Sequence, residues 1–510
     1  MGDNEKPPPR FKELYKQQQP ANRDVRHRRL VHEAQLRRLQ REQVFMDKRL
    51  RYRQPQESET ESEYEFTPSD TKQIIIGLKA SATNISQLGV VARTRHDERV
   101  GALKNLSTKL EQPSEELRRF VLEGSCMELL TKFFSATDAD EKLHSLWCLT
   151  NIAANEGRLA EKVLPAAPYL LSLVTSDNME LQNQAAWALG NLAAEGEKTR
   201  ETLHANGVLK PLVDLLGSTA DEAILQTACF AVSNMARKPN TYFDELFALK
   251  LPQLAAKQLV AFKEHQHCVT ELAWVFAYLA ASSSEQQIDE ILATGAIDTL
   301  LQSALDTAKA EAPGAALIPV IRTLGNIAAG TDDQTSSLVG KNGFVGLLVR
   351  CIESTSSRAV EKEALWALSC VTASRKADVD AVVDAGVVPD LVRIIEKQNF
   401  DIKKEAAFGL LNIAIIGGRA ADLPNERLIA EFVEFIKSQD EELVRMGVQY
   451  IAIVFEQLPD SKGPELLKGV AGGIGALENL IAVTHDDDTR SLLSVLIDQY
   501  YGEDTMEVED

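Results

Sequence analysis

The sequence predicts an all-α fold in which short helices stack, repeat after repeat, into a right-handed superhelix. The 510 residues are more than one compact core usually supports, so several domains or an extended repeat array are expected. Aromatic residues make up only 6% of the chain while Leu and Ala are abundant, which suits helices packed through small side chains. Similar segments also recur at a regular interval, which favours the repeat array.

The recurring segments share an anchor residue. The anchors are Trp147, Trp187, Phe230, Trp274, Arg322, Trp366 and Phe408. They are separated by 40, 43, 44, 48, 44 and 42 residues, a period typical of armadillo and HEAT helical repeats. One unit cannot bury its own apolar face, so stacked units are expected to share a continuous core and one long concave surface.

A turn glycine precedes one helix of most units, as in residues 205–208, 294–297, 342–345 and 385–389. Glycine permits a sharp bend between a first short helix and a second, and Pro389 suits a helix start. This pattern predicts three-helix armadillo repeats rather than two-helix HEAT repeats.

Charge and composition divide the chain into four parts. Residues 10–53 hold 14 Lys or Arg against 5 Asp or Glu, although the whole chain has a net charge of −20. Residues 1–53 are therefore expected to form a basic arm, and residues 54–70 an acidic disordered linker. Residues 71–501 are expected to hold about ten repeats, and residues 502–510 an acidic disordered tail.

The sequence argues against several classes of protein. No apolar run approaches the roughly 20 residues that span a bilayer, so no membrane association is expected. The six cysteines are scattered singly, without metal-binding spacing, and are predicted to be buried thiols. No phosphate-binding loop or nucleophile elbow is present, so neither an enzyme nor a cofactor is expected. The acidic body would repel phosphates, which argues against direct nucleic-acid binding.

A second position recurs four residues after each anchor, and five of the seven residues there are asparagine. The pairs are Trp147/Asn151, Trp187/Asn191, Phe230/Asn234, Trp274/Tyr278, Arg322/Asn326, Trp366/Cys370 and Phe408/Asn412. Positions i and i+4 share one helix face, so stacked repeats would arrange them as a ladder. Either the aromatics are core and the asparagines cap something, or the ladder lines a groove. We favour the groove, because Asn in mid-helix costs about half a kcal/mol relative to Ala.

Such a ladder has the chemistry of a peptide groove. Side-chain amides can donate to and accept from the backbone of an extended peptide. Indole walls accept the methylene stem of Lys or Arg, and each ring contributes about 0.5 to 2 kcal/mol of cation–π attraction. A carboxylate would then select a cation. The candidates are Glu195, which follows Asn191 by four residues, and Asp332, Asp333, Glu363 and Glu405 in the second half.

The body and the arm together resemble the importin-α family, adaptors that carry proteins with basic nuclear localisation signals. The family has Tyr at the Asn place of its fifth repeat and Arg at the Trp place of its sixth, as here in Tyr278 and Arg322. Residues 325–335 and 403–407 are similar to the family's sixth and eighth repeats, and RFKELYK with RDVRHRRLVHEAQLRRLQREQVFMDKRLR is similar to its importin-β-binding segment. The resemblance covers about residues 10–502.

The resemblance implies two signal-binding sites, which together would read bipartite signals. The major site would comprise Trp147, Asn151, Gln184, Trp187, Asn191, Glu195, Phe230 and Asn234. The minor site would comprise Arg322, Asn326, Thr335, Glu363, Trp366, Glu405, Phe408 and Asn412. The chain departs from the family at Phe230 and Phe408, where Trp is usual, at Cys370, which replaces an Asn, and at Asn155 and Ala160 beside the lysine pocket.

The resemblance also implies partners and a location. Cargo proteins with mono- or bipartite basic signals would bind the groove, importin-β would bind the arm, and a recycling exportin with its small GTPase would grip the last repeat. The protein would shuttle between cytoplasm and nucleus and meet the nuclear pore transiently. The arm residues concerned are Arg23, Arg26, Arg28, Arg29, Arg37, Arg38, Arg41, Lys48, Arg49 and Arg51. Lys48, Arg49 and Arg51 also imitate a localisation signal and could occupy the groove in cis.

One alternative within the same fold is an armadillo scaffold of the catenin type, which binds extended peptides without a transport role. The groove of such scaffolds is typically basic and takes acidic partners. The acidic body of this chain is opposite to that balance.

Overall fold

The computed structural model describes residues 90–134, 138–155, 157–237, 240–308, 314, 316–353, 357–397, 400–485 and 487–501. These residues form helices and turns, with no β-strand among them. The predicted arm, linker and acidic tail lie outside the described residues. The chain divides into two units, one holding described residues 90–431 and 449–463 and the other 432–448 and 464–501.

Most of the first unit is built from groups of three helices. It begins with α4 (Val90–Glu111), followed by α5 (Glu115–Leu122), α6 (Cys126–Phe134) and α7 (Ala139–Ala154). The next groups are α8 (Arg158–Glu161), α9 (Ala167–Val174) and α10 (Met179–Glu195), then α11 (Glu197–Ala205), α12 (Leu209–Ser218) and α13 (Glu222–Met235). A 3₁₀ turn, η1 (Leu164–Ala166), joins α8 to α9.

The same grouping continues along the chain. It comprises α14 (Phe243–Ala248), α15 (Leu251–Ala261) and α16 (Gln266–Ser282), then α17 (Glu285–Ala293), α18 (Ala296–Thr307) and α19 (Leu317–Ala328). These are followed by α20 (Asp332–Val339), α21 (Phe344–Glu353) and α22 (Arg358–Thr372), and by α23 (Lys376–Asp384), α24 (Val388–Lys397) and α25 (Phe400–Ile415).

The remaining helices are η2 (Ala420–Asp422), α26 (Asn425–Ile436), α27 (Glu441–Gln457), α28 (Lys462–Gly469), α29 (Gly473–Val483) and α30 (Asp487–Tyr501). In the second unit, the Tyr501 hydroxyl donates to the backbone carbonyl of Pro464 at 2.9 Å. No single described helix is long and apolar enough to cross a membrane, although α28 and α29, bent by 92°, pass that test as a pair.

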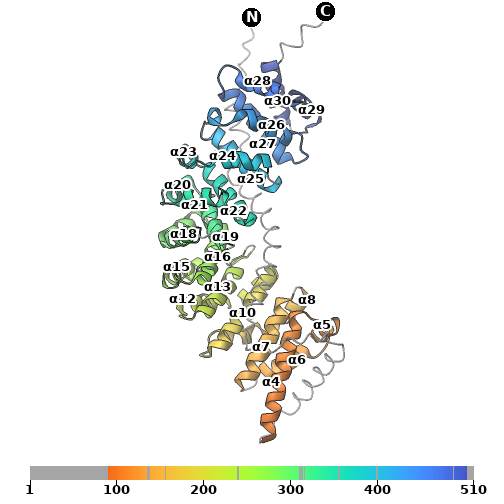
Figure 1. The fold of residues 1–510 in the computed structure, drawn as a ribbon. Helices are drawn as coiled ribbons and strands as arrows, with labels where there is room; N and C mark the ends of the chain where they lie inside the picture. Colours follow the sequence, from red (N-terminus) through yellow and green to blue (C-terminus); the bar gives the residue numbers. More distant parts are fainter. Residues whose placement is uncertain are drawn as a thin grey trace, which may run out of the picture. The chain divides into compact units, whose positions relative to one another are not determined.

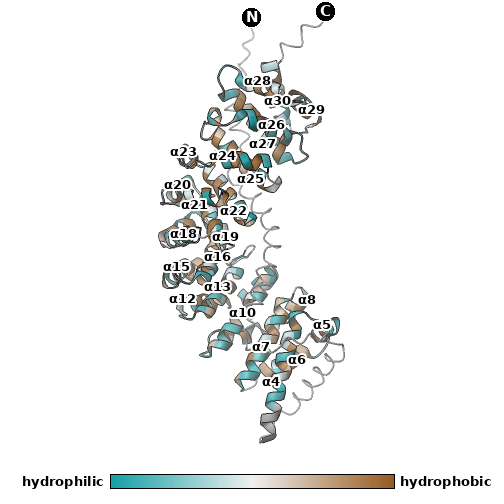
Figure 2. Ribbon diagram, viewed as in Figure 1, coloured by the Kyte–Doolittle hydropathy of each residue, from teal (hydrophilic) through white to brown (hydrophobic). Residues whose placement is uncertain are grey.

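The third helices of successive groups pack against one another. Each contacts the next in the order α4, α7, α10, α13, α16, α19, α22 and α25. The second helices α12, α15 and α18 contact one another in the same successive way and form a parallel row (Figure 1). Figure 2 shows that apolar and polar residues share the same helices. The apolar sides form a core that passes from group to group, as at the fully buried Leu189, Val232, Leu279 and Leu324. This arrangement confirms the predicted all-α repeat fold.

Local signals set the helix boundaries. Asp138, Asn178 and Asp221 cap α7, α10 and α13 by accepting hydrogen bonds from backbone N–H groups in the first turn. The predicted turn glycines are confirmed, because Gly207, Gly295, Gly343 and Gly386 have φ between 75° and 89°, a region that glycine enters without strain.

The six cysteines are free and buried, as predicted. Burial raises the pKa of the Cys126 thiol to about 12 and that of Cys351 to about 11. These thiols are therefore protonated at neutral pH and poor nucleophiles.

Candidate functional site

The third helices carry the ladder that the sequence predicts. Trp147 and Asn151 lie in α7, Trp187 and Asn191 in α10, and the later pairs in α13, α16, α19, α22 and α25. Trp187 and Trp366 are 8% and 6% exposed, whereas Trp147, Phe230 and Phe408 are half-buried. The stacking of third helices brings these residues from distant parts of the sequence into one row.

Each ladder asparagine is hydrogen-bonded to the preceding repeat. The Nδ2 atoms donate to a backbone carbonyl 41 to 49 residues earlier, at 2.8 to 3.2 Å. The donor and acceptor pairs are Asn151 and Ser107, Asn191 and Thr150, Asn234 and Gly190, Asn326 and Ala277, and Asn412 and Ser369. Each acceptor directly precedes the ladder position of its own repeat. One N–H of each asparagine amide therefore caps a backbone carbonyl of the preceding repeat, as the interpretation of these residues as caps expects.

In three of the ladder asparagines, the second N–H and the oxygen of the amide make no hydrogen bond within the described residues. Asn191, Asn234 and Asn326 make no other side-chain hydrogen bond within the described residues. Because an amide carries two N–H donors and one acceptor oxygen, each retains an N–H and its Oδ1. Fixing one N–H also fixes the plane of the amide, so the remaining groups have a defined direction.

Aromatic anchors pack on glycines of the preceding third helix. A Cβ added to Gly190 would lie 2.7 Å from the Phe230 ring, and a Cβ on Gly325 would collide with the Trp366 ring. Only glycine leaves room for a ring at these two positions. The rings therefore take their orientation from the backbone of the repeat before them.

The ladder is interrupted at Tyr278. Its ring stacks on Trp274, with centroids 5.8 Å apart and an interplanar angle of 26°. The Arg322 guanidinium carbon lies 5.9 Å from the centroid of the Trp274 ring. This arrangement joins α16 to α19 by aromatic and cation–π contact in place of an amide.

Arg322 also forms a bidentate ion pair with Glu363. Its Nε donates to Oε2 at 3.0 Å, and its second donor is in close contact with Oε1. The two side chains are 6% and 12% exposed. The charge of Glu363, a candidate for selecting a cation, is therefore balanced by an arginine of the same site.

The other candidate carboxylates differ in their surroundings. Glu195, at the end of α10, accepts a hydrogen bond of 2.6 Å from the backbone N–H of Gly157. Glu405 lies 3.5 Å from the Ser369 hydroxyl. Asp332 and Asp333 begin α20, a first helix rather than a third, and both face Arg375.

Two further predicted site residues are buried. The Nε2 of Gln184 donates to the Thr150 hydroxyl at 2.7 Å, next to the carbonyl that receives Asn191. Thr335 is 1% exposed, and its hydroxyl donates to the carbonyls of Ala328 and Thr331. Gln184 thus hydrogen-bonds the same residue, Thr150, as the ladder residue Asn191 does. Thr335 is instead hydrogen-bonded within its own repeat.

The first pair of the ladder, which lies one repeat before Trp147 and Asn151, was not identified from the sequence. Lys104 and Thr108 in α4 occupy the anchor and asparagine positions of the first repeat, because the Ser107 carbonyl accepts a hydrogen bond from Asn151 just as the Thr150 carbonyl does from Asn191. Both side chains are exposed. Their spacing of 43 residues from Trp147 and Asn151 was the signal that could have found them.

Comparison with known proteins identifies the family. The chain is 31% identical over 441 residues to importin subunit alpha-9 of Arabidopsis thaliana, which covers 80% of each chain. It is 30% identical over 442 residues to importin subunit alpha-2 of Oryza sativa subsp. japonica, covering 82% of this chain and 81% of the relative. The chain belongs to the importin-α family. The resemblance noted in the sequence is confirmed.

Other comparisons agree with the fold of this importin-α family member. The HEAT-like repeat family matches residues 140–192 and 180–235. The crystal structure of an engineered protein matches with a TM-score of 0.66 at 23% identity, covering 83% of this chain and 98% of that chain. Family membership supports a general role as a transport adaptor.

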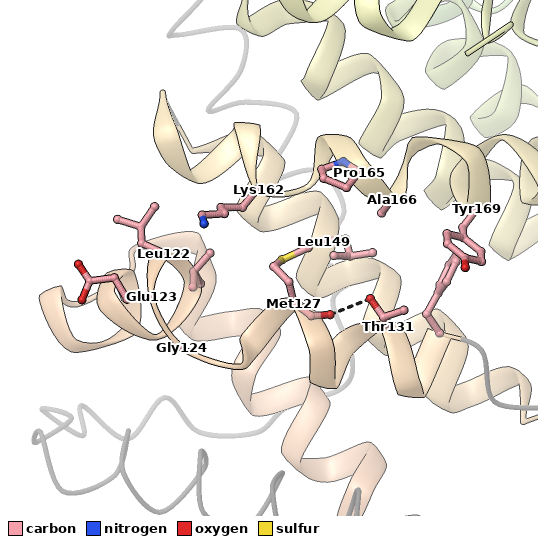
Figure 3. A pocket seen from close by; sticks show the side chains of 12 residues that line it. Leu122, Glu123, Gly124, Met127, Thr131, Leu149, Lys162, Pro165, Ala166 and Tyr169 are labelled. Carbon is pink, nitrogen blue, oxygen red and sulfur yellow. Dashed lines mark hydrogen bonds between the residues drawn. The ribbon is translucent and has the colours of Figure 1, made fainter.

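A cavity of about 420 Å³ lies between α5 and α6 on one side and α8 to α9 on the other, and no ladder residue of this importin-α lines it (Figure 3). Met127, Leu149 and Tyr169 approach it from three different helices. Tyr169 is 51% exposed, and its ring packs edge-on against the Phe134 ring with centroids 5.8 Å apart. The cavity accompanies the shortest repeat interval, where α8 has four residues and Pro165 and Pro168 follow closely.

A possible ligand trio lies at the start of α7. His96, Asp138 and Asp140 each offer an atom within 4.8 Å of the others. Asp138 is however the N-cap of α7, accepting from the Glu141 N–H at 2.9 Å, and its Oδ1 lies 3.1 Å from His96 Nε2. The positive end of a helix dipole also disfavours a cation there. We therefore interpret the group as an ion pair and helix cap.

Proposed function

We propose that this importin-α family member is a nuclear import adaptor that binds basic localisation signals as extended peptides along its third helices. The observation that carries the proposal is the row of asparagines whose amides are each fixed by the preceding repeat. In Asn191, Asn234 and Asn326 one N–H and the Oδ1 remain for a ligand backbone.

Charge supports a basic ligand. The whole chain carries a net charge of −20, although residues 10–53 are basic. The repeat body is therefore strongly acidic and attracts Lys- and Arg-rich peptides over long range. Aromatic anchors between the asparagines supply surfaces for lysine and arginine stems.

The interruption of the ladder supports two sites rather than one. Trp274, Tyr278 and Arg322 pack on one another between the Asn191–Asn234 rungs and the Asn326–Asn412 rungs. A signal with two basic clusters would bind on both sides of this block. The second cluster then binds intramolecularly, which raises affinity without new contacts.

The proposal extends to partners outside the described residues. The basic arm, residues 1–53, would bind importin-β, and the last repeat, which ends in α30, would be gripped by the recycling exportin with its GTPase. The protein would shuttle between cytoplasm and nucleus. This role requires no enzymatic activity, cofactor, membrane or direct nucleic-acid contact.

Binding of a fluorescent lysine-rich signal peptide to the full chain tests the proposal. We expect affinity that falls steeply with salt and is lost in Trp187→Ala. Tyr169→Ala is the matched control, since Tyr169 is an exposed aromatic residue outside the ladder. Circular dichroism establishes that both variants remain folded. If the wild-type chain fails to bind at low salt, the proposed cargo function is wrong and a scaffold that binds other extended peptides becomes the better interpretation.

A further inference from the structure

The row of third helices begins one repeat before the aromatic anchors. Asn151 in α7 donates to the Ser107 carbonyl of α4 in the way that Asn191 in α10 donates to the Thr150 carbonyl of α7. The helices α4 and α7 also pack against each other as the later third helices do. A peptide bound along the ladder would therefore reach α4 at one end.

Lys104 gives this end of the row a chemistry opposite to that of the other repeats. Its side chain is exposed and stands 43 residues before Trp147, in the anchor position. Thr108 stands in the asparagine position, but its hydroxyl donates to the Lys104 backbone carbonyl at 3.2 Å, within the same helix. An ammonium in place of an aromatic ring repels the lysine or arginine that a ring would attract.

No carboxylate of the described residues neutralises the Lys104 charge. Lys104 forms no ion pair and no side-chain hydrogen bond among them. On a helix the side chains within reach lie three or four residues away. None is acidic here, since they are Val100, Gly101, Ser107 and Thr108. Glu141 of α7 accepts a hydrogen bond of 2.7 Å from Arg99 instead. The Lys104 ammonium is therefore available to a ligand.

The histidine beside Trp147 does not compete with Lys104 for an anion. The His144 ring lies edge-on to the Trp147 ring, with centroids 6.1 Å apart. Burial, and after it the positive charge of Lys104, lowers the pKa of His144, while Asp140 acts in the opposite direction. The imidazole is therefore neutral at pH 7. The effect on His144 also places the Lys104 charge within electrostatic reach of the first aromatic anchor.

We infer that Lys104 binds an acidic side chain of the signal peptide, so that the groove prefers a basic cluster flanked on one side by Asp or Glu. The inference rests on the proposed function and adds a specificity determinant to it. Packed helices lie about 8 to 10 Å apart, and an extended peptide advances about 3.3 Å per residue. The acidic residue would therefore stand about three positions beyond the residue that contacts Trp147.

Three fluorescent peptides with the same lysine-rich cluster test the inference on the full chain. One has Glu three residues after the cluster, one has Glu three residues before it, and the reference has Gln at both places. We expect one acidic peptide to bind about two- to fivefold more tightly than the reference, the gain of an exposed ion pair. The other should bind more weakly, because the acidic body repels an added carboxylate.

Two substitutions of Lys104 assign the preference to this residue. Lys104→Gln should reduce the advantage of the favoured acidic peptide to about one, and Lys104→Glu should make that peptide bind more weakly than the reference. Lys257→Glu is the matched control, because Lys257 is an exposed lysine on the second helix α15 and the change in net charge is the same. This control should keep the wild-type preference.

The outcomes separate this inference from the proposed function. If the wild type binds the reference peptide but neither acidic peptide binds more tightly, only the inference is overturned. The same conclusion follows if Lys257→Glu abolishes the preference as fully as Lys104→Glu does. If Lys104→Glu does not fold, Lys104→Gln decides alone. If the wild type binds none of the three peptides at low salt, the proposed function and the inference are both overturned.

Discussion

The Asn191 side chain donates a hydrogen bond of 3.1 Å from Nδ2 to the backbone carbonyl of Thr150, in the third helix of the preceding repeat. Asn191 is 2% exposed, so the bond is sheltered from water. Four other asparagines make the equivalent bond to their own preceding repeats. The ladder that we assign to peptide binding therefore also joins the repeats to one another.

Replacing Asn191 by alanine should weaken both stability and binding. We expect the free energy of unfolding to fall by about 1 to 2 kcal/mol, because the Thr150 carbonyl loses its buried donor. Urea denaturation measures this loss. Asn206→Ala is the matched control, since the Asn206 amide is exposed and donates within its own helix, to Thr202. Equal destabilisation by the two substitutions would contradict the inter-repeat role.

Gly325→Ala should be strongly destabilising although alanine is the better helix former. The added methyl group would collide with the Trp366 ring, and overpacking of a core costs about 1 to 3 kcal/mol. Gly346→Ala in α21 should instead be neutral or stabilising by up to about 1 kcal/mol, because Gly346 is exposed and its Cβ would meet open space. Thermal unfolding of the two variants compares them directly, and a stable Gly325→Ala protein would refute the packing argument.

Removing Glu363 should leave the buried Arg322 cation without its bidentate carboxylate. We expect Glu363→Ala to cost about 3 to 5 kcal/mol, since Arg322 is 6% exposed. The double substitution Arg322→Met with Glu363→Leu should restore most of the loss, because neither charge is then buried. Asp214→Ala, which breaks the exposed pair with Lys210, should change stability by less than about 1 kcal/mol. Chemical denaturation distinguishes these cases, and a small effect of Glu363→Ala would show that the pair is solvated.

The contact between α4 and α7 should depend on pH. The hydrogen bond with Asp138 raises the pKa of His96 above its usual value of 6.5, with Asp97 and Glu141 acting in the same direction against partial burial. A raised folded-state pKa means that the stabilisation is complete below pH 6.5 and is lost as pH rises through the folded pKa. Arg99 forms a second ion pair between these two helices, with Glu141.

Thermal unfolding between about pH 5.5 and pH 9 checks the His96 prediction. His96→Gln should lower the melting temperature at the acidic end and match the wild type at the alkaline end. The effect should be below about 1 kcal/mol, because the pair lies at the surface. His485→Gln, at an exposed histidine of the second unit, is the control. A difference that grows with rising pH would have the wrong sign for this mechanism.

Much of the repeat fold could be predicted from local signals. The period of the anchors, the turn glycines such as Gly207 and the placement of Trp187 and Asn191 four residues apart on one helix are all found in the structure. Each is a property of one repeat, because helix periodicity and the conformational freedom of glycine act over a few residues. Because the same pattern recurs in successive repeats, the period can be recognised from the sequence.

The partners of those residues could not be predicted in the same way. The acceptor of Asn191 is a backbone carbonyl 41 residues away, which carries no sequence signature of its own. Arg322 and Glu363 were both assigned to one site as ligand-binding residues, yet nothing in the sequence indicated that they pair with each other. The contact of Gly157 with Glu195 was missed for the same reason.

The sequence therefore determined the repeat, its three helices and the row of residues on one helix face, because these depend on interactions between near neighbours in the chain. The hydrogen bonds, ion pairs and ring contacts that orient the row follow only once successive third helices are stacked. That stacking decides which atom of one repeat meets which atom of the next.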